Sequence, residues 1–174
     1  MTTPDEAVLP WRLMYDSVNP EAVPVDAEMV GGYVDGRWAW PADAWDQWPH
    51  AAKVRVSNVM PHDIRHCSVA DVETGALTIA DAPSFVRQRN AFRPGTASIY
   101  CSEATLPFVG KACAGLDYWV WVAWWNGYPS LAEVQGLRAS LRPGVKLAAI
   151  QYRNDAAADV DLSAVFEPGW HPKP

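Results

Sequence analysis

The chain has 174 residues, of which 49% are hydrophobic and 20% are charged, and this composition predicts one soluble globular domain rather than a disordered chain. A net charge of −6 with scattered basic residues argues against a nucleic-acid-binding protein. No apolar run approaches the roughly 20 residues of a membrane span, and residues 1–10 lack the basic and apolar segments of a signal peptide.

We therefore expect no membrane partner and a cytoplasmic location in the producing cell. A role outside that cell would require host lysis or delivery as part of a virus particle.

Eight short apolar runs follow one another along the chain and are the predicted strands. Each run is nearly continuous rather than alternating, which is typical of parallel strands that are covered on both faces. The runs are Trp11–Tyr15, Met29–Val34, Lys53–Val59, Cys67–Val72, Ala97–Cys101, Tyr118–Trp125, Val145–Tyr152 and Val160–Phe166.

Helix-start signals separate many of these runs. Ser130 followed by Glu133 has the pattern of a capping box. We expect helices to begin near Pro20 and Pro41 and to span 81–92, 106–114 and 130–141. We expect loops or single turns at 61–66 and 154–159, because the chain allows only about 22 residues for each strand and its crossover, fewer than a typical barrel has.

Repeated strand and crossover units predict an α/β fold, namely a compact TIM-like (β/α)8 barrel with shortened or missing helices over residues 11–166. Residues 1–10 and 167–174 are expected to be tails. A doubly wound open sheet is the alternative fold, but the turn at 16–20 has no Gly-rich phosphate loop.

Acidic residues lie at the ends of several predicted strands. Asp16 closes the first strand and Asp35 follows the second, whereas Asp161 lies at the start of the eighth. Asp71 and Glu73 close the fourth strand. Because the C-terminal ends of barrel strands converge on one face, these carboxylates are candidates for a shared catalytic site.

The spacing of Asp71 and Glu73 is informative because residues i and i+2 of a strand point the same way. We expect both carboxylates to face the barrel axis, with Val72 packed outward. Two carboxylates in one cavity do not ionise independently, so one is kept protonated near neutral pH. Glycosidases use such a pair, and the alternatives are a helix cap or a structural salt bridge.

A magnesium or calcium site is another use of clustered acids, but His62 and His66 lie in a loop-like segment beside Pro61. We predict no metal and no cofactor. No GxSxG nucleophile motif occurs in the chain.

The chain is rich in tryptophan, with 10 residues of this type. Tryptophan rings pack against the C–H faces of sugars, so the excess is compatible with glycan binding, and core filling is the alternative. The three cysteines, Cys67, Cys101 and Cys113, are an odd number, which argues against a complete disulfide framework. We expect them to be buried, with one disulfide as the alternative.

Taken in order, these segments resemble glycoside hydrolase family 25, the lysozyme-like muramidases, and its smaller family 25-like relatives in actinobacteria and their phages. The resembling segments are Asp16, 71–73, 99–102, 121–125, 151–152 and 160–163. The segment 31–40 resembles short proteins of the same actinobacteria and phages. The chain departs from the family pattern at two places. Ser17–Pro20 follow the first strand, where the family usually has a Trp or His and a Gln. Trp125 stands where the family has Tyr.

The resemblance implies cleavage of peptidoglycan between N-acetylmuramic acid and N-acetylglucosamine. It makes Glu73 the general acid, and Asp71 the residue that tunes it or orients a substrate N-acetyl group. It also makes Asp16 and Asp161 the groups that stabilise developing positive charge. The cleft would be lined by Tyr33, Asp35, Tyr100, Trp121, Trp124 and Gln151.

Three hypotheses follow. The first is a cell-wall glycosidase encoded by a phage or an actinobacterium. The second is a non-catalytic module on the same barrel that binds cell-wall polysaccharide or forms part of a virion together with other phage proteins. The third is an unrelated α/β protein whose acids do not share a cleft.

Overall fold

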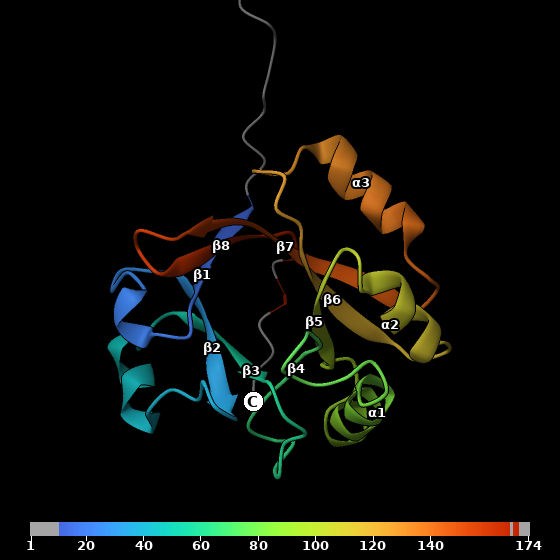
Figure 1. Cartoon of the computed structure of the whole chain (residues 1–174), viewed down its shortest axis with the longest axis horizontal. Helices are drawn as coiled ribbons and strands as arrows, with labels where there is room; N and C mark the ends of the chain where they lie inside the picture. Colours follow the sequence, from blue (N-terminus) through green and yellow to red (C-terminus); the bar gives the residue numbers. More distant parts are fainter. Residues whose placement is uncertain (1–10, 168, 171–174) are drawn as a thin grey trace, which may run out of the picture.

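A closed barrel of eight strands in chain order forms the centre of the computed structural model, which describes residues 11–167 and 169–170 (Figure 1). The closed barrel is confirmed, and the open doubly wound sheet is wrong. The strands are β1 (Arg12–Asp16), β2 (Met29–Asp35), β3 (Ala52–Ser57), β4 (Val69–Asp71), β5 (Ser98–Ser102), β6 (Tyr118–Ala123), β7 (Val145–Asp155) and β8 (Val160–Val165).

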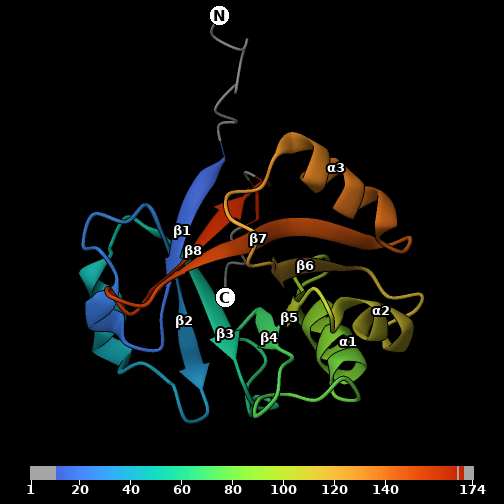
Figure 2. The same ribbon diagram turned by 45° about the horizontal axis from the view of Figure 1, so that its top comes forward.

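The last strand runs in the opposite direction to the others. Strands β1 to β7 pair in parallel, whereas β8 is antiparallel to both β7 and β1 and lies between them (Figure 2). Only residues 156–159 separate β7 from β8, and a parallel crossover needs about ten residues or more. The predicted eighth strand-and-crossover unit is therefore a hairpin.

Within the described chain, α-helices follow only β4, β5 and β6. They are α1 (Ala82–Phe92), α2 (Leu106–Ala112) and α3 (Leu131–Ser140), and α3 begins with the predicted capping box of Ser130 and Glu133. The helices expected near Pro20 and Pro41 are short 3-10 turns, Pro20–Ala22 and Ala42–Gln47. Figure 1 shows the α-helices beside one half of the barrel and the 3-10 turns beside the other.

The outer face of the barrel packs beneath the helices. Val72 is 1% exposed and belongs to a cluster with Phe85 of α1, Ile99 of β5 and Val134 of α3. Val72 thus points outward, as predicted, because neighbouring strand residues point to opposite faces.

Tryptophans cover the half of the barrel that has 3-10 turns. Trp40 stacks near Trp45 and Trp48, with ring centroids 4.6 and 5.6 Å away, and all three rings are buried. A Cβ atom at Gly32 would lie 2.5 Å from the Trp40 ring, so glycine is required there. These three tryptophans are part of the core.

Trp170 closes the barrel interior at the end opposite the strand C-termini. It is 3% exposed, and its Nε1 donates to Ser98 Oγ at 3.0 Å. Part of the predicted tail 167–174 is therefore core, while Pro168 and residues 171–174 lie outside the described residues, as does the predicted tail 1–10.

The cysteines are buried and unpaired, as expected for small apolar side chains. No helix in the described part of the chain is long and apolar enough to cross a membrane.

Candidate active site

A cavity of about 450 Å³ opens where the C-terminal ends of the parallel strands meet. Its walls combine carboxylates, amides and aromatic rings, and none of the lining residues in the described chain is a lysine, arginine or histidine. The lining residues are Asp16, Ser17, Val18, Gly31, Gly32, Tyr33, Val56, Glu73, Tyr100, Trp121, Trp125, Gln151, Asn154 and Asp161.

Strands β1 and β8 bring two of the predicted carboxylates together. Asp16 and Asp161 are directly opposite each other in the antiparallel pair. Because β8 is reversed, its first residues lie at the barrel end where β1 finishes. A parallel eighth strand would have placed Asp161 at the other end. The β7–β8 turn is tied to this end by Ser17 Oγ, which donates to the Asp159 carbonyl at 2.7 Å.

The amide of Gln151 links these two acids to a tyrosine. The Tyr100 hydroxyl donates to Gln151 Oε1 at 2.6 Å. Gln151 Nε2 donates to Asp16 Oδ2 at 2.8 Å and to Asp161 Oδ2 at 3.1 Å. Asn154 Nδ2 donates to the other oxygen of Asp161 at 2.5 Å.

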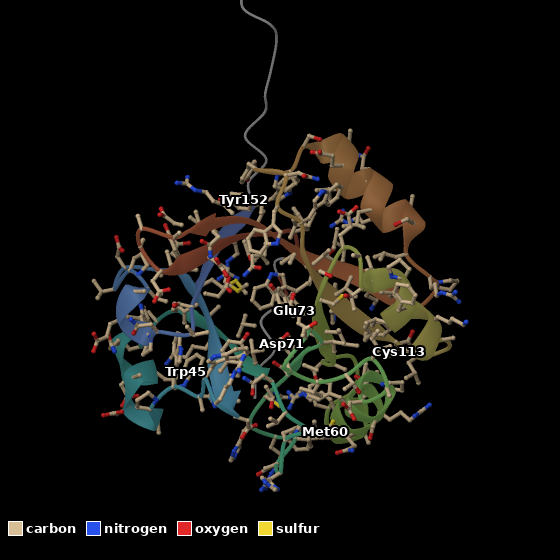
Figure 3. The ribbon with its side chains drawn as sticks, viewed as in Figure 1. Trp45, Met60, Asp71, Glu73, Cys113 and Tyr152 are labelled. Atoms are coloured by element: carbon tan, nitrogen blue, oxygen red, sulfur yellow. The ribbon has the colours of Figure 1, made fainter. Side chains whose placement is uncertain are left out.

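Asp71 and Glu73 lie near the centre of the barrel in Figure 3 but differ in exposure, since Asp71 is buried and Glu73 is exposed. Asp71 is 1% exposed, accepts from the Tyr33 hydroxyl at 3.0 Å and does not line the cavity. Its Oδ1 is buried without a hydrogen-bond partner among the described residues. Glu73 lies just beyond β4 and does line the cavity, so Glu73 is the member of the pair that a bound molecule can reach.

Burial is the main cause of the unusual protonation of this pair. It raises the pKa of Asp71 to about 7, helped by the negative charge of Glu73 and opposed by the hydrogen bond from Tyr33. The pKa of Glu73 is also raised, first by burial and then by the charge of Asp161. A proton is therefore retained in this pair at higher pH than in free carboxylic acids.

The second pair is perturbed in the same direction. The pKa of Asp16 is raised well above its usual value by burial and by Asp161, against the hydrogen bond from Gln151. Burial raises the pKa of Asp161. The hydrogen bond from Asn154 lowers it, and the negative charge of Asp159 raises it again. Burial, increased by repulsion from nearby aspartates, therefore favours protonated carboxyl groups in the cavity.

Two predicted cleft residues do not line the cavity. Asp35 accepts a hydrogen bond from Ser57 Oγ at 3.3 Å at the end of β2. Trp124 packs against the outer cluster, whereas Trp125 lines the cavity with 53% of its surface exposed. Counting alternate residues from Trp121 would have indicated Trp125, because neighbours along an extended chain point in opposite directions.

Asn154 is a further cavity residue that the sequence analysis missed. Pairing between β7 and β8 shifts between Gln151 and Arg153, which places Asn154 opposite Asp161. Such an irregularity leaves no simple sequence signal.

A metal centre is not apparent in the described residues, which contain no group of three or more His, Cys, Asp or Glu side chains arranged to hold an ion.

Comparisons of the chain with protein-family models, with curated proteins and with solved structures found no match. The resemblance to glycoside hydrolase family 25 therefore stays a prediction that rests on the motifs quoted above.

Proposed function

We propose that the chain is a muramidase-like glycoside hydrolase that acts on bacterial cell-wall glycan. The observation that carries the proposal is the cavity lined by Asp16, Glu73 and Asp161 together with aromatic rings and no basic side chain, with Asp71 buried beside Glu73. Glycoside hydrolysis needs a protonated acid and a negative charge on the two sides of one bond.

Glu73 is the proposed general acid. It reaches the cavity and its pKa is raised, so it keeps a proton for the leaving oxygen to higher pH than a free glutamic acid does. Asp71 does not line the cavity, so its proposed role is to tune Glu73 rather than to contact the scissile bond. The two carboxyls titrate together, because the negative charge of Glu73 helps burial to raise the pKa of Asp71 to about 7.

Asp16 and Asp161 are the proposed stabilisers of positive charge at the anomeric carbon. Their placement on β1 and β8 puts both at the same cavity. The transition state of glycoside hydrolysis resembles an oxocarbenium ion, and a negative charge held by this pair lowers its energy.

Aromatic rings are the proposed sugar-binding walls. Tyr100 and Trp121 pack together with ring centroids 4.6 Å apart, and Trp125 is the exposed ring. A cavity of about 450 Å³ is within the usual range for small-molecule sites. The helices α1, α2 and α3 each connect consecutive parallel strands, which supports descent from a (β/α)8 barrel with missing helices.

The direct test is digestion of actinobacterial peptidoglycan across a range of pH, with release of reducing ends and the mass of the products as readouts. We expect Glu73→Gln to lower kcat by about 10²–10⁴-fold, the usual contribution of a general acid. Glu28→Gln is the matched control, because Glu28 is exposed and immediately precedes β2, at the opposite end of the barrel. Intact peptidoglycan after treatment with the wild-type protein at every pH would refute the proposal.

We also propose a second function, a non-catalytic glycan-binding or virion module that reaches the cell wall after lysis or within a phage particle. Two exposed rings favour it, because Trp125 and Tyr128 on the segment after β6 are each 53% exposed. Binding to cell-wall polysaccharide that survives Glu73→Gln but is lost in Trp125→Ala would support this function. Loss of binding in both variants, together with loss of activity, would refute it.

A further inference from the structure

Gln151 is a buried amide whose polar contacts all lead to candidate active-site groups. It is 1% exposed and belongs to β7. Its oxygen accepts from Tyr100, and its nitrogen donates to Asp16 and Asp161. Gln151 lines the cavity, but its polar groups are already engaged and leave little to offer a sugar.

The orientation of this amide is determined by its neighbours. The NH2 group has two protons, and the carboxylate oxygens of Asp16 and Asp161 are both acceptors. A reversed amide would place its carbonyl oxygen against those two oxygens and its NH2 against the Tyr100 hydroxyl. The observed orientation satisfies the two amide protons and the amide oxygen at once, so it is strongly preferred.

The hydrogen bonds also distinguish the two acids. Asp161 accepts at both oxygens, from Gln151 and from Asn154, and these two hydrogen bonds favour its charged form. Asp16 accepts only at Oδ2, and its Oδ1 is buried without a partner among the described residues. A carboxyl oxygen that is buried and unpaired is costly when charged, so a proton is best placed on Asp16 Oδ1.

We infer that Gln151 is a positioning residue that holds Asp161 as the charged member and Asp16 as the protonated member of one carboxylate pair, with Tyr100 fixing the amide. The arrangement of protons stands on the hydrogen bonds alone, and its catalytic meaning rests on the proposed function. For a glycosidase, Asp161 then supplies the negative charge of the proposed charge-stabilising pair, and Asp16 stays neutral beside it.

Other titratable groups face this pair, so their ionisation also affects the pKa values of Asp16 and Asp161. Glu73 and Asp71 lie on the β4 side, Asp159 lies in the β7–β8 turn, and the remaining groups are the hydroxyls of Tyr33 and Tyr100.

Carbon-13 NMR titration of aspartate carboxyl groups tests the inference without any substrate. Signals of the pair are assigned by their loss in Asp16→Asn and Asp161→Asn. In the wild type we expect Asp161 to titrate at lower pH than Asp16. In Gln151→Met, which fills the same space without N–H donors, we expect both pKa values to rise by about one pH unit or more.

Two further variants keep the experiment decisive. Tyr100→Phe leaves the ring but frees the amide to turn, so a smaller rise in both pKa values is expected. Gln135→Met is the matched control, since Gln135 is exposed on α3, and no change is expected. Unchanged pKa values in Gln151→Met, or a lower pKa for Asp16 than for Asp161 in the wild type, would overturn the inference. If Gln151→Met does not fold, Tyr100→Phe decides in the same way.

Kinetics separate this inference from the proposed function. In an active glycosidase, Gln151→Met should lower kcat more than it raises KM and should move the acid limb of the kcat/KM profile to higher pH. Damage to folding alone would lower the amount of active protein and leave the limb in place. A wild type that is inactive on peptidoglycan removes the proposed function, whereas the NMR titration still tests the placement of the proton.

Discussion

Replacing Asp71 with asparagine should change how the stability of the protein depends on pH. Burial raises the pKa of Asp71 from 3.8 to about 7, so the folded state holds a proton that the unfolded chain has already released between these two values. Stability from this group is fully present below the unfolded pKa and is lost as pH rises through the folded pKa. A shift of this size corresponds to a loss of up to about 4 kcal/mol at alkaline pH.

Urea denaturation between pH 4 and pH 8.5, followed by tryptophan fluorescence, measures this loss. We expect the wild type to lose about 2–4 kcal/mol more stability over this range than Asp71→Asn, because asparagine cannot ionise. Comparison of slopes cancels the constant cost of the unpaired asparagine NH2. Asp26→Asn is the control, because Asp26 is exposed. Equal slopes for wild type and Asp71→Asn would refute the reasoning that this carboxyl is buried and protonated.

Three further predictions concern packing and binding. Trp170→Ala should lower the free energy of unfolding, measured with urea, by about 3–5 kcal/mol, because it leaves a cavity at the barrel end opposite the strand C-termini. A loss below about 1 kcal/mol would mean that Trp170 is not part of the core. Gly32→Ala should lower the melting temperature, because the new Cβ would lie 2.5 Å from the Trp40 ring. Gly136→Ala has open space in α3 and should raise the melting temperature, because alanine favours a helix more than glycine does. Equal shifts in the two variants would contradict the clash at Gly32. Trp125→Ala should lower glycan affinity while changing stability by less than about 0.5 kcal/mol, and unchanged affinity would remove Trp125 from the binding surface.

Apolar runs predicted all eight strands, because a strand covered on both faces needs a nearly continuous apolar segment. The direction of β8 was missed although the sequence contained the clue, since the segment between β7 and β8 is too short for a parallel crossover. The same reversal explains why Asp161, at the start of its strand, joins acids that lie at the ends of theirs.

Other features depend on tertiary packing and could not be predicted from local patterns. Trp170 lies among Pro and Gly residues, which indicated a tail, but its ring fills the open end of the barrel. Gln151 was predicted to line the sugar cleft and does line the cavity, but its hydrogen bonds to Tyr100, Asp16 and Asp161 depend on the tertiary fold.

The antiparallel β8 has a consequence for the order of folding. Asp16 and Asp161 come from the first and last strands of the barrel, so their pairing closes the longest loop in the sheet. Contacts of such high sequence separation form slowly, since the entropy of loop closure must be overcome first. Until β8 arrives, β1 and β7 have unpaired edges that can join other chains. Assembly of the acidic cavity and protection from edge-to-edge aggregation are therefore completed in the same folding step.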